Sequence, residues 1–143
     1  MRPKCSWCKG INKTITFTSS NNNKTFKIFR SVNCQSSWVI YIIECNICNL
    51  QYIGKSETAF NLRLNNHRNH IKKGISRCEL TEHFLHNKRK HNFDNNVIIT
   101  ITEQIRKDNV SNEPEKDLLR HREIFWQKKL NCMQPNGLNK RTG

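Results

Sequence analysis

The chain has 143 residues, with 25 Lys and Arg against 11 Asp and Glu, and its formal net charge is +14. Hydrophobic residues make up 35% of it, enough for one modest core, and no stretch approaches the roughly 20 apolar residues of a membrane helix. The basic N-terminus lacks the apolar segment of a secretory signal, so we expect an intracellular protein. Its charge favours a polyanionic partner, with nucleic acid ahead of an anionic membrane, although a merely basic, soluble protein is the alternative.

The chain contains seven cysteines, and two pairs of them are spaced as C-x2-C. Without a secretory signal, this pattern favours metal binding over disulfides. Cys5 and Cys8 form the first pair and Cys34 follows, so these three are candidate ligands of one Zn²⁺. Its fourth ligand could be Cys78, Cys132 or a histidine, and free buried thiols are the alternative.

Two short alternating segments, Thr14–Thr18 and Thr25–Phe29, flank the turn-rich SSNNN and predict a β-hairpin. We expect residues 1–36 to form a Cys-rich, basic hairpin extension and residues 37–143 to form the main domain, with an inserted zinc knuckle. The basic side chains of the hairpin could contact nucleic acid or simply protect a sheet edge.

An apolar, β-branched run at residues 38–43 predicts a buried strand, and Leu50–Ile53 is expected to pair back on it as a second strand. Tyr41 and Tyr52 then lie one on each strand of this hairpin. Gly54 is expected to open a turn where the backbone can approach a ligand closely.

A helix is predicted from Thr58 to Lys73, with Ser56 as its cap and Gly74 as its stop. One stripe at helical spacing contains Phe60, Leu64, His67 and Ile71. Because residues four apart share a helix face, Arg63 and His67 can both point at whatever the two tyrosines face. This is a candidate site.

The second C-x2-C pair, Cys45 and Cys48, lies in the turn between the two tyrosine strands. Two thiolates so placed can share a tetrahedral Zn²⁺, and the other ligands would come from beyond the helix. His83, His86 and His91 are the candidates, with a surface histidine cluster as the alternative. Residues 80–85 are predicted to form a short helix here.

The C-terminal part predicts a third strand, Val97–Ile105, and a helix from about 113 to 130. The apolar stripe of this helix is Leu119, Trp126 and Leu130. Glu123 falls in the middle of that stripe, where a buried carboxylate needs a partner. The partner could be an arginine or a divalent metal ion. Asn139 follows a PNG turn and could hydrogen-bond near a site or close a loop.

Along the chain the motifs follow in the order Val39-Ile40-Tyr41, Tyr52-Ile53-Gly54, Arg63, His67, Glu123 and PNGLN at 135–139. This ordered set resembles the GIY-YIG endonuclease family over residues 37–139. The resemblance implies an α+β fold, a small three-stranded antiparallel sheet flanked by helices. Val39 stands where glycine is typical. The stretch from Tyr52 to Arg63 carries one residue more than in some relatives, which leaves Lys55 as an additional candidate for phosphate contact.

More narrowly, the chain is similar to the endonuclease domain of Penelope-like retroelements. The similarity lies in the C-x2-C between the tyrosine triplets, the later EHF with a downstream histidine, and the cysteine-rich lead-in. It implies a Zn²⁺ held by Cys45, Cys48, His83 and His91, with His86 competing for the last place. It also implies a nuclear location, DNA as substrate, and the RNA and reverse transcriptase of a retroelement as partners.

The function expected from these motifs is a metal-dependent DNA endonuclease that hydrolyses a phosphodiester, nicking target DNA for retroelement insertion. Glu123 would hold Mg²⁺ or Mn²⁺, and Arg63 would clamp the scissile phosphate. Tyr41, polarised by His67 or Tyr52, would orient or deprotonate the water, its pKa lowered by Arg63 and the metal. Further substrate contacts are expected from Gly54, Lys55 and Asn139. The alternative is a non-catalytic, zinc-stabilised nucleic-acid-binding module, which has no need of Glu123 on a packed helix face.

Overall fold

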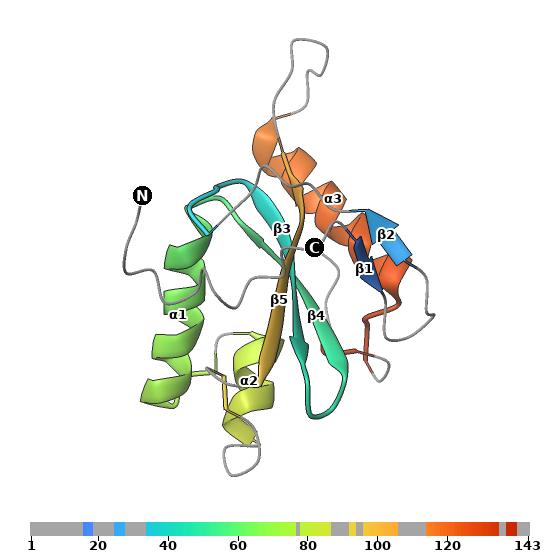
Figure 1. The fold of residues 1–143 in the computed structure, drawn as a ribbon. Coiled ribbons are helices and arrows are strands. Elements are labelled where there is room, and N and C mark those ends of the chain that lie inside the picture. Colours follow the sequence, from blue (N-terminus) through green and yellow to red (C-terminus); the bar gives the residue numbers. More distant parts are fainter. Residues whose placement is uncertain are drawn as a thin grey trace.

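The computed structural model describes residues 16–18, 25–27, 34–76, 78–86, 92–93, 96–105, 114–134 and 137–139. In chain order its elements are β1 (Thr16–Thr18), β2 (Thr25–Lys27), β3 (Val39–Cys45), β4 (Leu50–Ser56), α1 (Phe60–Lys73), α2 (Glu79–His86), β5 (Val97–Gln104) and α3 (Glu115–Leu130). The three longer strands form one antiparallel sheet in the order β4-β3-β5, flanked by helices (Figure 1). The predicted α+β fold is therefore confirmed.

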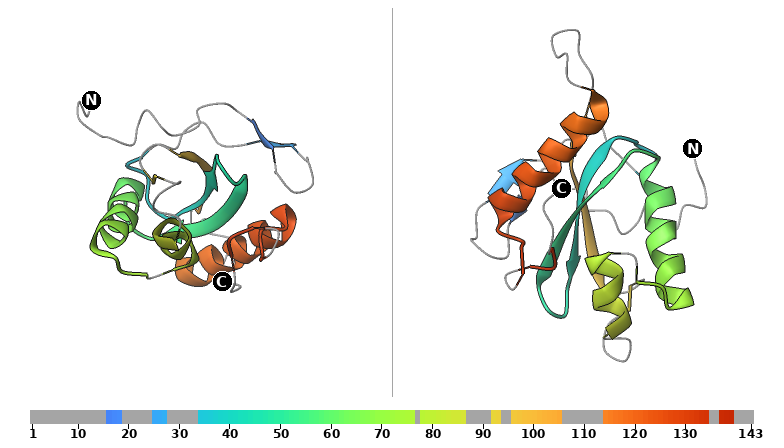
Figure 2. Two further views of the ribbon diagram at one scale, coloured as in Figure 1. Left: turned by 90° about the horizontal axis from the view of Figure 1, so that it is seen from below. Right: turned by 180° about the vertical axis from the view of Figure 1, so that it is seen from behind.

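Both faces of this sheet are covered, as Figure 2 shows, with α1 and α2 on one side and α3 on the other. Alternate residues of β3 point to the two sides. Val39, Tyr41 and Ile43 join the core next to α1 and α2, while Ile40 and Ile42 join the core next to α3. A central strand buried on both faces has no place for polar side chains, which explains the unbroken apolar run in the sequence.

Helix α1 begins two residues later than predicted. Ala59 is its N-cap and makes no side-chain cap, so the prediction that Ser56 caps this helix is wrong. The Ser56 hydroxyl instead donates to the Thr58 carbonyl at 2.7 Å. The first N–H groups of α1 are taken up by the incoming chain, because Phe60 N donates to the Ser36 carbonyl at 2.9 Å and Asn61 N to that of Cys34 at 2.6 Å.

The end of α1 agrees with the prediction, since Gly74 adopts the left-handed conformation with φ 73°. The predicted N-terminal hairpin is also present, with Thr16–Thr18 paired antiparallel to Thr25–Lys27. Cys5 and Cys8 lie outside the described residues. In the part of the chain that the structure describes, no helix is long and apolar enough to cross a membrane.

Candidate active site and metal centre

The β3–β4 hairpin places the two tyrosines on one face of the sheet. In its register Tyr41 lies opposite Gly54 and Ile43 lies opposite Tyr52. The rings of Tyr41 and Tyr52 have centroids 6.5 Å apart, and both belong to the core next to α1 and α2. The hairpin predicted from the sequence thus places both tyrosine rings next to each other in the candidate site.

Gly54 lies within β4, which continues to Ser56, so the prediction that it opens a turn is wrong. A Cβ atom at Gly54 would lie only 2.4 Å from both Cζ and the hydroxyl oxygen of Tyr41. The close approach that requires a glycine is therefore that of the Tyr41 ring. Any larger residue at this position would displace the phenol.

The buried face of α1 meets this phenol. The Phe60 ring packs on Tyr41 with centroids 4.8 Å apart, and the Tyr41 hydroxyl lies 2.9 Å from Nε2 of His67. His67 is 1% exposed and its ring also lies edge-on to Tyr52, at 6.5 Å between centroids. The helical stripe therefore brings His67 to Tyr41, as predicted.

Arg63 lies on the same side of α1 and is only partly buried. Its Nε atom is buried and has no hydrogen-bond partner among the described residues. Burial would lower the pKa of Arg63, but the neighbouring Tyr41, and Tyr52 less strongly, hold that pKa above its ordinary value. The guanidinium is thus a fixed positive charge beside the phenols, with donor capacity left for a ligand.

The two phenols and the imidazole of this cluster are all shifted toward their neutral forms. Burial raises the pKa of Tyr41 more than Arg63 lowers it, and burial likewise raises the pKa of Tyr52. Burial, followed by the positive charge of Arg63, lowers the pKa of His67 to about 3. At neutral pH both phenols are therefore protonated and His67 is uncharged. Arg63 lowers the pKa of Tyr41, as expected, but in the protein alone desolvation outweighs this one cation.

Glu123 sits on the packed face of α3 and is 6% exposed, as the periodicity predicted. Its ion-pair partner is Lys55 of β4, with Nζ 3.6 Å from Oε1, and not an arginine. That Oε1 atom is buried and has no hydrogen-bond partner among the described residues. Burial raises the pKa of Glu123, against the opposing effect of Lys55.

The cluster of Tyr41, Tyr52, Arg63 and His67 is electrostatically coupled to Glu123, which lies on the other side of the sheet. Helix α3 covers the sheet face opposite to α1, yet the charge of Glu123 contributes to the raised pKa of both Tyr41 and Tyr52. Arg63 in turn lowers the pKa of Glu123. The carboxylate, the guanidinium and the phenols therefore lie within electrostatic reach of one another, although they come from both sides of the sheet.

The side chain of Asn139 binds the backbone of the edge strand β4. Its Oδ1 accepts from the backbone N–H of Ile53 at 2.9 Å and its Nδ2 donates to the Ile53 carbonyl at 3.0 Å. The amide thus pairs with one peptide unit of the edge strand as a neighbouring strand would. Of the two roles left open by the sequence, hydrogen bonding near the site describes this amide, because Ile53 lies between Tyr52 and Gly54, and Asn139 holds β4 in place.

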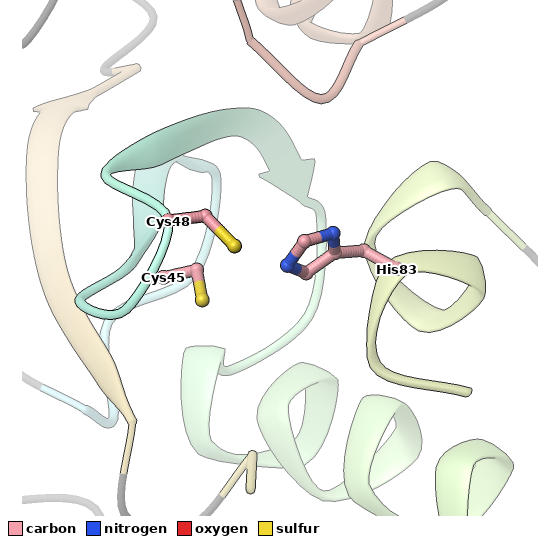
Figure 3. Close-up of side chains that lie close together, drawn as sticks. All are labelled: Cys45, Cys48 and His83. Atoms are coloured by element: carbon pink, nitrogen blue, oxygen red, sulfur yellow. The ribbon is translucent and has the colours of Figure 1, made fainter. Parts of the chain in front are cut away.

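A second cluster lies at the tip of the same hairpin. Cys45 and Cys48 point toward His83 of α2, and their ligand atoms all lie within 4.8 Å of one another (Figure 3). Ligands of a tetrahedral Zn²⁺ at about 2.0 to 2.3 Å lie roughly 3.5 to 4 Å apart, so a small closure would fit the ion. Three of the four predicted ligands are therefore together. His91 lies outside the described residues, and the His86 side chain is not described.

Residues 37–136 match the family model of the GIY-YIG catalytic domain. The chain belongs to this family. The predicted family membership is confirmed. Membership in this family of catalytic domains indicates that the protein is a nuclease.

Two solved structures are similar to this GIY-YIG domain. One is titled as the catalytic domain of the homing endonuclease I-TevI, with 29% identity, a TM-score of 0.53, and coverage of 72% of this chain and 97% of that one. The other is titled as the catalytic domain of the intron endonuclease I-TevI in a glutamate-to-alanine variant, with 30% identity, a TM-score of 0.55, and coverage of 73% and 93%. No curated protein sequence is significantly similar to the chain.

Cys78 also belongs to the cluster around Tyr41 and His67. The sequence did not predict this position, because it suggested Cys78 only as a zinc ligand. Its Sγ lies 3.9 Å from Nδ1 of His67, on the side of the ring away from Tyr41. Cys78 is separated from His67 by the end of α1 and a loop. No local pattern predicts a contact of this kind, because the packing of α2 against α1 creates it.

Proposed function

We propose that this GIY-YIG domain is a metal-dependent DNA endonuclease that hydrolyses a phosphodiester bond and nicks one strand. The observation that carries the proposal is that two buried polar atoms lack hydrogen-bond partners among the described residues, one on each side of the sheet that carries the tyrosines. Arg63 Nε is a donor and Glu123 Oε1 an acceptor. Such atoms are costly in a folded protein unless a ligand satisfies them. A phosphate oxygen suits the first and a cation suits the second.

Glu123 fits a hard divalent ion because its ligand atom is a carboxylate oxygen. The residue is 6% exposed, and the Lys55 ammonium that partly compensates its charge lies at 3.6 Å, longer than a tight ion pair. Glu123 would hold Mg²⁺ or Mn²⁺. When bound, such an ion neutralises charge on the phosphoryl and leaving 3′ oxygens.

Arg63 would bind the scissile phosphate. Arg63 is partly exposed while Tyr41 and His67 are fully buried, so a phosphate would reach Arg63 first. The planar fork of an arginine matches two phosphate oxygens and stays charged at any working pH. Lys55 adds a second positive charge on the Glu123 side of the same edge strand.

Tyr41 and His67 would handle the proton of the attacking water. The Tyr41 hydroxyl and His67 Nε2 are 2.9 Å apart, so the phenol proton can pass to the imidazole without any rearrangement. A bound phosphate brings negative charge next to this pair and favours the imidazolium, which opposes the effect of Arg63 on the pKa of His67. Tyr41 would then orient the water or take its proton.

The broader context of the reaction is also proposed. The +14 net charge favours a nucleic-acid substrate. The C-x2-C between the tyrosine triplets and the cysteine-rich lead-in support a Penelope-like retroelement origin. In that case the nick serves insertion in the nucleus, and the element's RNA and reverse transcriptase are the partners.

Zinc would be structural. Cys45, Cys48 and His83 join the tip of the β3–β4 hairpin to α2, and His91 or His86 would complete a tetrahedral site. The site ties the strand that carries Tyr41 to a helix beside the cluster, which holds the catalytic face in shape. A second Zn²⁺ on Cys5, Cys8 and Cys34 is also proposed, and Cys34 is buried.

A zinc-stabilised binding module without catalysis is the second candidate. The observation in its favour is that burial raises the pKa of both phenols, which makes each a poor base in the protein alone. Such a module would bind DNA through Arg63 and the basic surface and leave the backbone intact.

Plasmid nicking distinguishes these candidates. Zinc-loaded protein is incubated with supercoiled plasmid, with and without added Mg²⁺ or Mn²⁺, so that no chelator disturbs the zinc. We expect nicked circles only when the divalent ion is present. Tyr41→Phe, which keeps the ring and loses the hydroxyl, should bind DNA with parental affinity and fail to nick. Intact plasmid at every divalent-ion concentration, with DNA binding retained, would establish the binding module instead.

A further inference from the structure

Cys78 is held firmly at the start of α2. Its carbonyl accepts the N–H of Glu82 at 3.0 Å, which makes it the residue that precedes the first turn of the helix. Its own N–H donates to Thr81 Oγ1 at 3.1 Å, and that hydroxyl donates back to the Cys78 carbonyl at 3.0 Å. With its backbone bound at these points, Cys78 presents its sulfur to His67 at 3.9 Å from Nδ1.

The partners of Tyr41 decide which nitrogen of His67 carries the proton. The positive charge of Arg63 lies close enough to Tyr41 to lower the pKa of this phenol. A cation attracts the phenol oxygen and turns its O–H away, toward His67. Tyr41 is protonated at neutral pH, so its own O–H needs an acceptor. Nε2 of His67 is the acceptor at 2.9 Å.

An acceptor Nε2 places the imidazole proton on the other nitrogen. His67 is uncharged, so it carries one ring proton, and that proton must be on Nδ1. The group in contact with Nδ1 is the Cys78 sulfur. Sulfur is a weak but real acceptor, and the separation of 3.9 Å is near the outer limit for such a bond.

We infer that Cys78 is a positioning residue whose sulfur accepts the Nδ1–H of His67 and so keeps Nε2 free to take the Tyr41 proton. The inference rests on the proposed endonuclease function. It follows the general logic by which a third group orients a histidine that serves as proton acceptor. Without the sulfur, the ring can adopt the other tautomer or rotate, and Nε2–H would then face the phenol with no acceptor for the Tyr41 proton.

The test combines the nicking rate with a direct measurement of the tautomer. Zinc-loaded protein labelled with ¹⁵N at histidine reports by NMR which ring nitrogen of His67 is protonated, and a His67→Gln sample assigns the signal. We expect Nδ1 protonated in the parental protein and a shift toward the other tautomer in Cys78→Ala. The single-turnover nicking rate of Cys78→Ala at saturating DNA should fall about tenfold, as loss of one weak orienting bond predicts. Its Kd for DNA should not change.

Matched variants keep the test independent of folding. Cys78→Ser retains an acceptor and a good helix-capping side chain, so it should recover part of the rate and of the tautomer preference. Cys132→Ala removes another buried cysteine, on the α3 side of the sheet, and should leave the His67 tautomer at the parental value.

Two results would overturn the inference. One is an Nε2-protonated His67 in the parental protein. The other is a folded Cys78→Ala or Cys78→Ser series in which neither the tautomer nor the rate changes. A parental protein that has the Nδ1–H tautomer and a tautomer shift in Cys78→Ala, yet never nicks DNA, would support the Cys78 contact and overturn the endonuclease.

Discussion

Lys55 Nζ lies 3.6 Å from Oε1 of Glu123, and this ion pair joins the edge strand β4 to α3. The two side chains are unequally buried, because 32% of the Lys55 side-chain surface is exposed but only 8% of the Glu123 side-chain surface. Lysine can therefore turn its ammonium into water if the carboxylate is neutralised. A buried arginine in its place would be left without a counter-charge.

Glu123→Gln separates a catalytic carboxylate from a structural one. The substitution keeps the shape and removes the charge, so nicking should fall by several orders of magnitude. The melting temperature should change little, because Lys55 regains solvent. DNA binding without divalent ions should hold or tighten, since repulsion of the phosphate is relieved. Asp117→Asn, an exposed acid in the first turn of the same helix, controls for the loss of one negative charge.

The nicking rate and the melting temperature of Glu123→Gln are measured on one preparation. A stable variant that nicks at the parental rate would remove Glu123 from the site. A collapsed melting temperature would assign Glu123 to structure.

Gly54→Ala tests the packing of the phenol. The added Cβ would lie 2.4 Å from Tyr41 Cζ, so either the ring or β4 must move. We expect a loss of about 1 to 3 kcal/mol of stability by overpacking, and nicking reduced at least a hundredfold because Tyr41 leaves His67. Gly74→Ala is the matched control, since its Cβ would meet nothing within 4 Å and only the backbone φ of 73° is strained. Parental nicking by a folded Gly54→Ala protein would show that the position of the Tyr41 ring does not limit the reaction.

Cys48→Ser tests the metal centre. Structural Zn²⁺ can contribute on the order of 10 kcal/mol to a small domain, so the variant should lose zinc by elemental analysis and melt at a much lower temperature. Cys132→Ser, at a buried cysteine away from this centre, should retain the zinc held by Cys45, Cys48 and His83. Parental protein that contains no zinc and still folds cooperatively with reduced thiols would exclude a structural metal.

The fourth zinc ligand can be identified by a pair of histidine variants. His83→Gln should lower zinc content because its ring lies beside Cys45 and Cys48. His86→Gln and His91→Gln are then compared, and the one that loses zinc to the same degree supplies the remaining ligand. Unchanged zinc in both would point to water or a residue elsewhere.

DNA affinity should depend steeply on salt. The +14 chain releases counterions from each phosphate that it contacts, so Kd for a duplex of arbitrary sequence should weaken at least a hundredfold between about 50 and 200 mM salt. The slope of log Kd against log salt concentration gives the number of phosphate contacts. A flat dependence would be inconsistent with electrostatic binding.

The stability of the protein should fall as the pH drops below about 6.5, and His67 should be one cause. Burial holds the pKa of His67 near 3 in the folded protein, whereas about 6.5 applies to the unfolded chain. The unfolded chain therefore takes up a proton between these values and the folded protein does not. The contribution is complete above the unfolded pKa, and about 2 kcal/mol of it is lost by pH 5.

Urea unfolding at about pH 7.5 and pH 5 measures this loss by linear extrapolation. In His67→Gln the drop in stability between the two pH values should be smaller by that amount. His121→Gln, which changes an exposed histidine on α3, should show the parental drop. An identical pH dependence in all three proteins would show that His67 does not titrate as its burial requires.

The sequence by itself determined the elements and most members of the cluster. The apolar, β-branched run and the C-x2-C turn after it placed Tyr41 and Tyr52 on paired strands. The helical pattern put His67 on the buried face of α1, because side-chain direction follows from local backbone geometry. The burial of Glu123 followed from the same rule. In each case the signal lay within one element or between two adjacent ones.

Only the tertiary structure decided which groups from distant elements meet. Glu123 pairs with Lys55, the Asn139 amide binds the Ile53 backbone, and the Cys78 sulfur reaches His67. Gly54 illustrates the same limit, because a glycine after a strand commonly signals a turn, while here it makes room for a ring from the neighbouring strand. These contacts depend on how α2 and α3 dock on the sheet and on where chain segments far apart in sequence come to lie. Local periodicity contains no information about that docking, since it specifies the face of an element and not its neighbour.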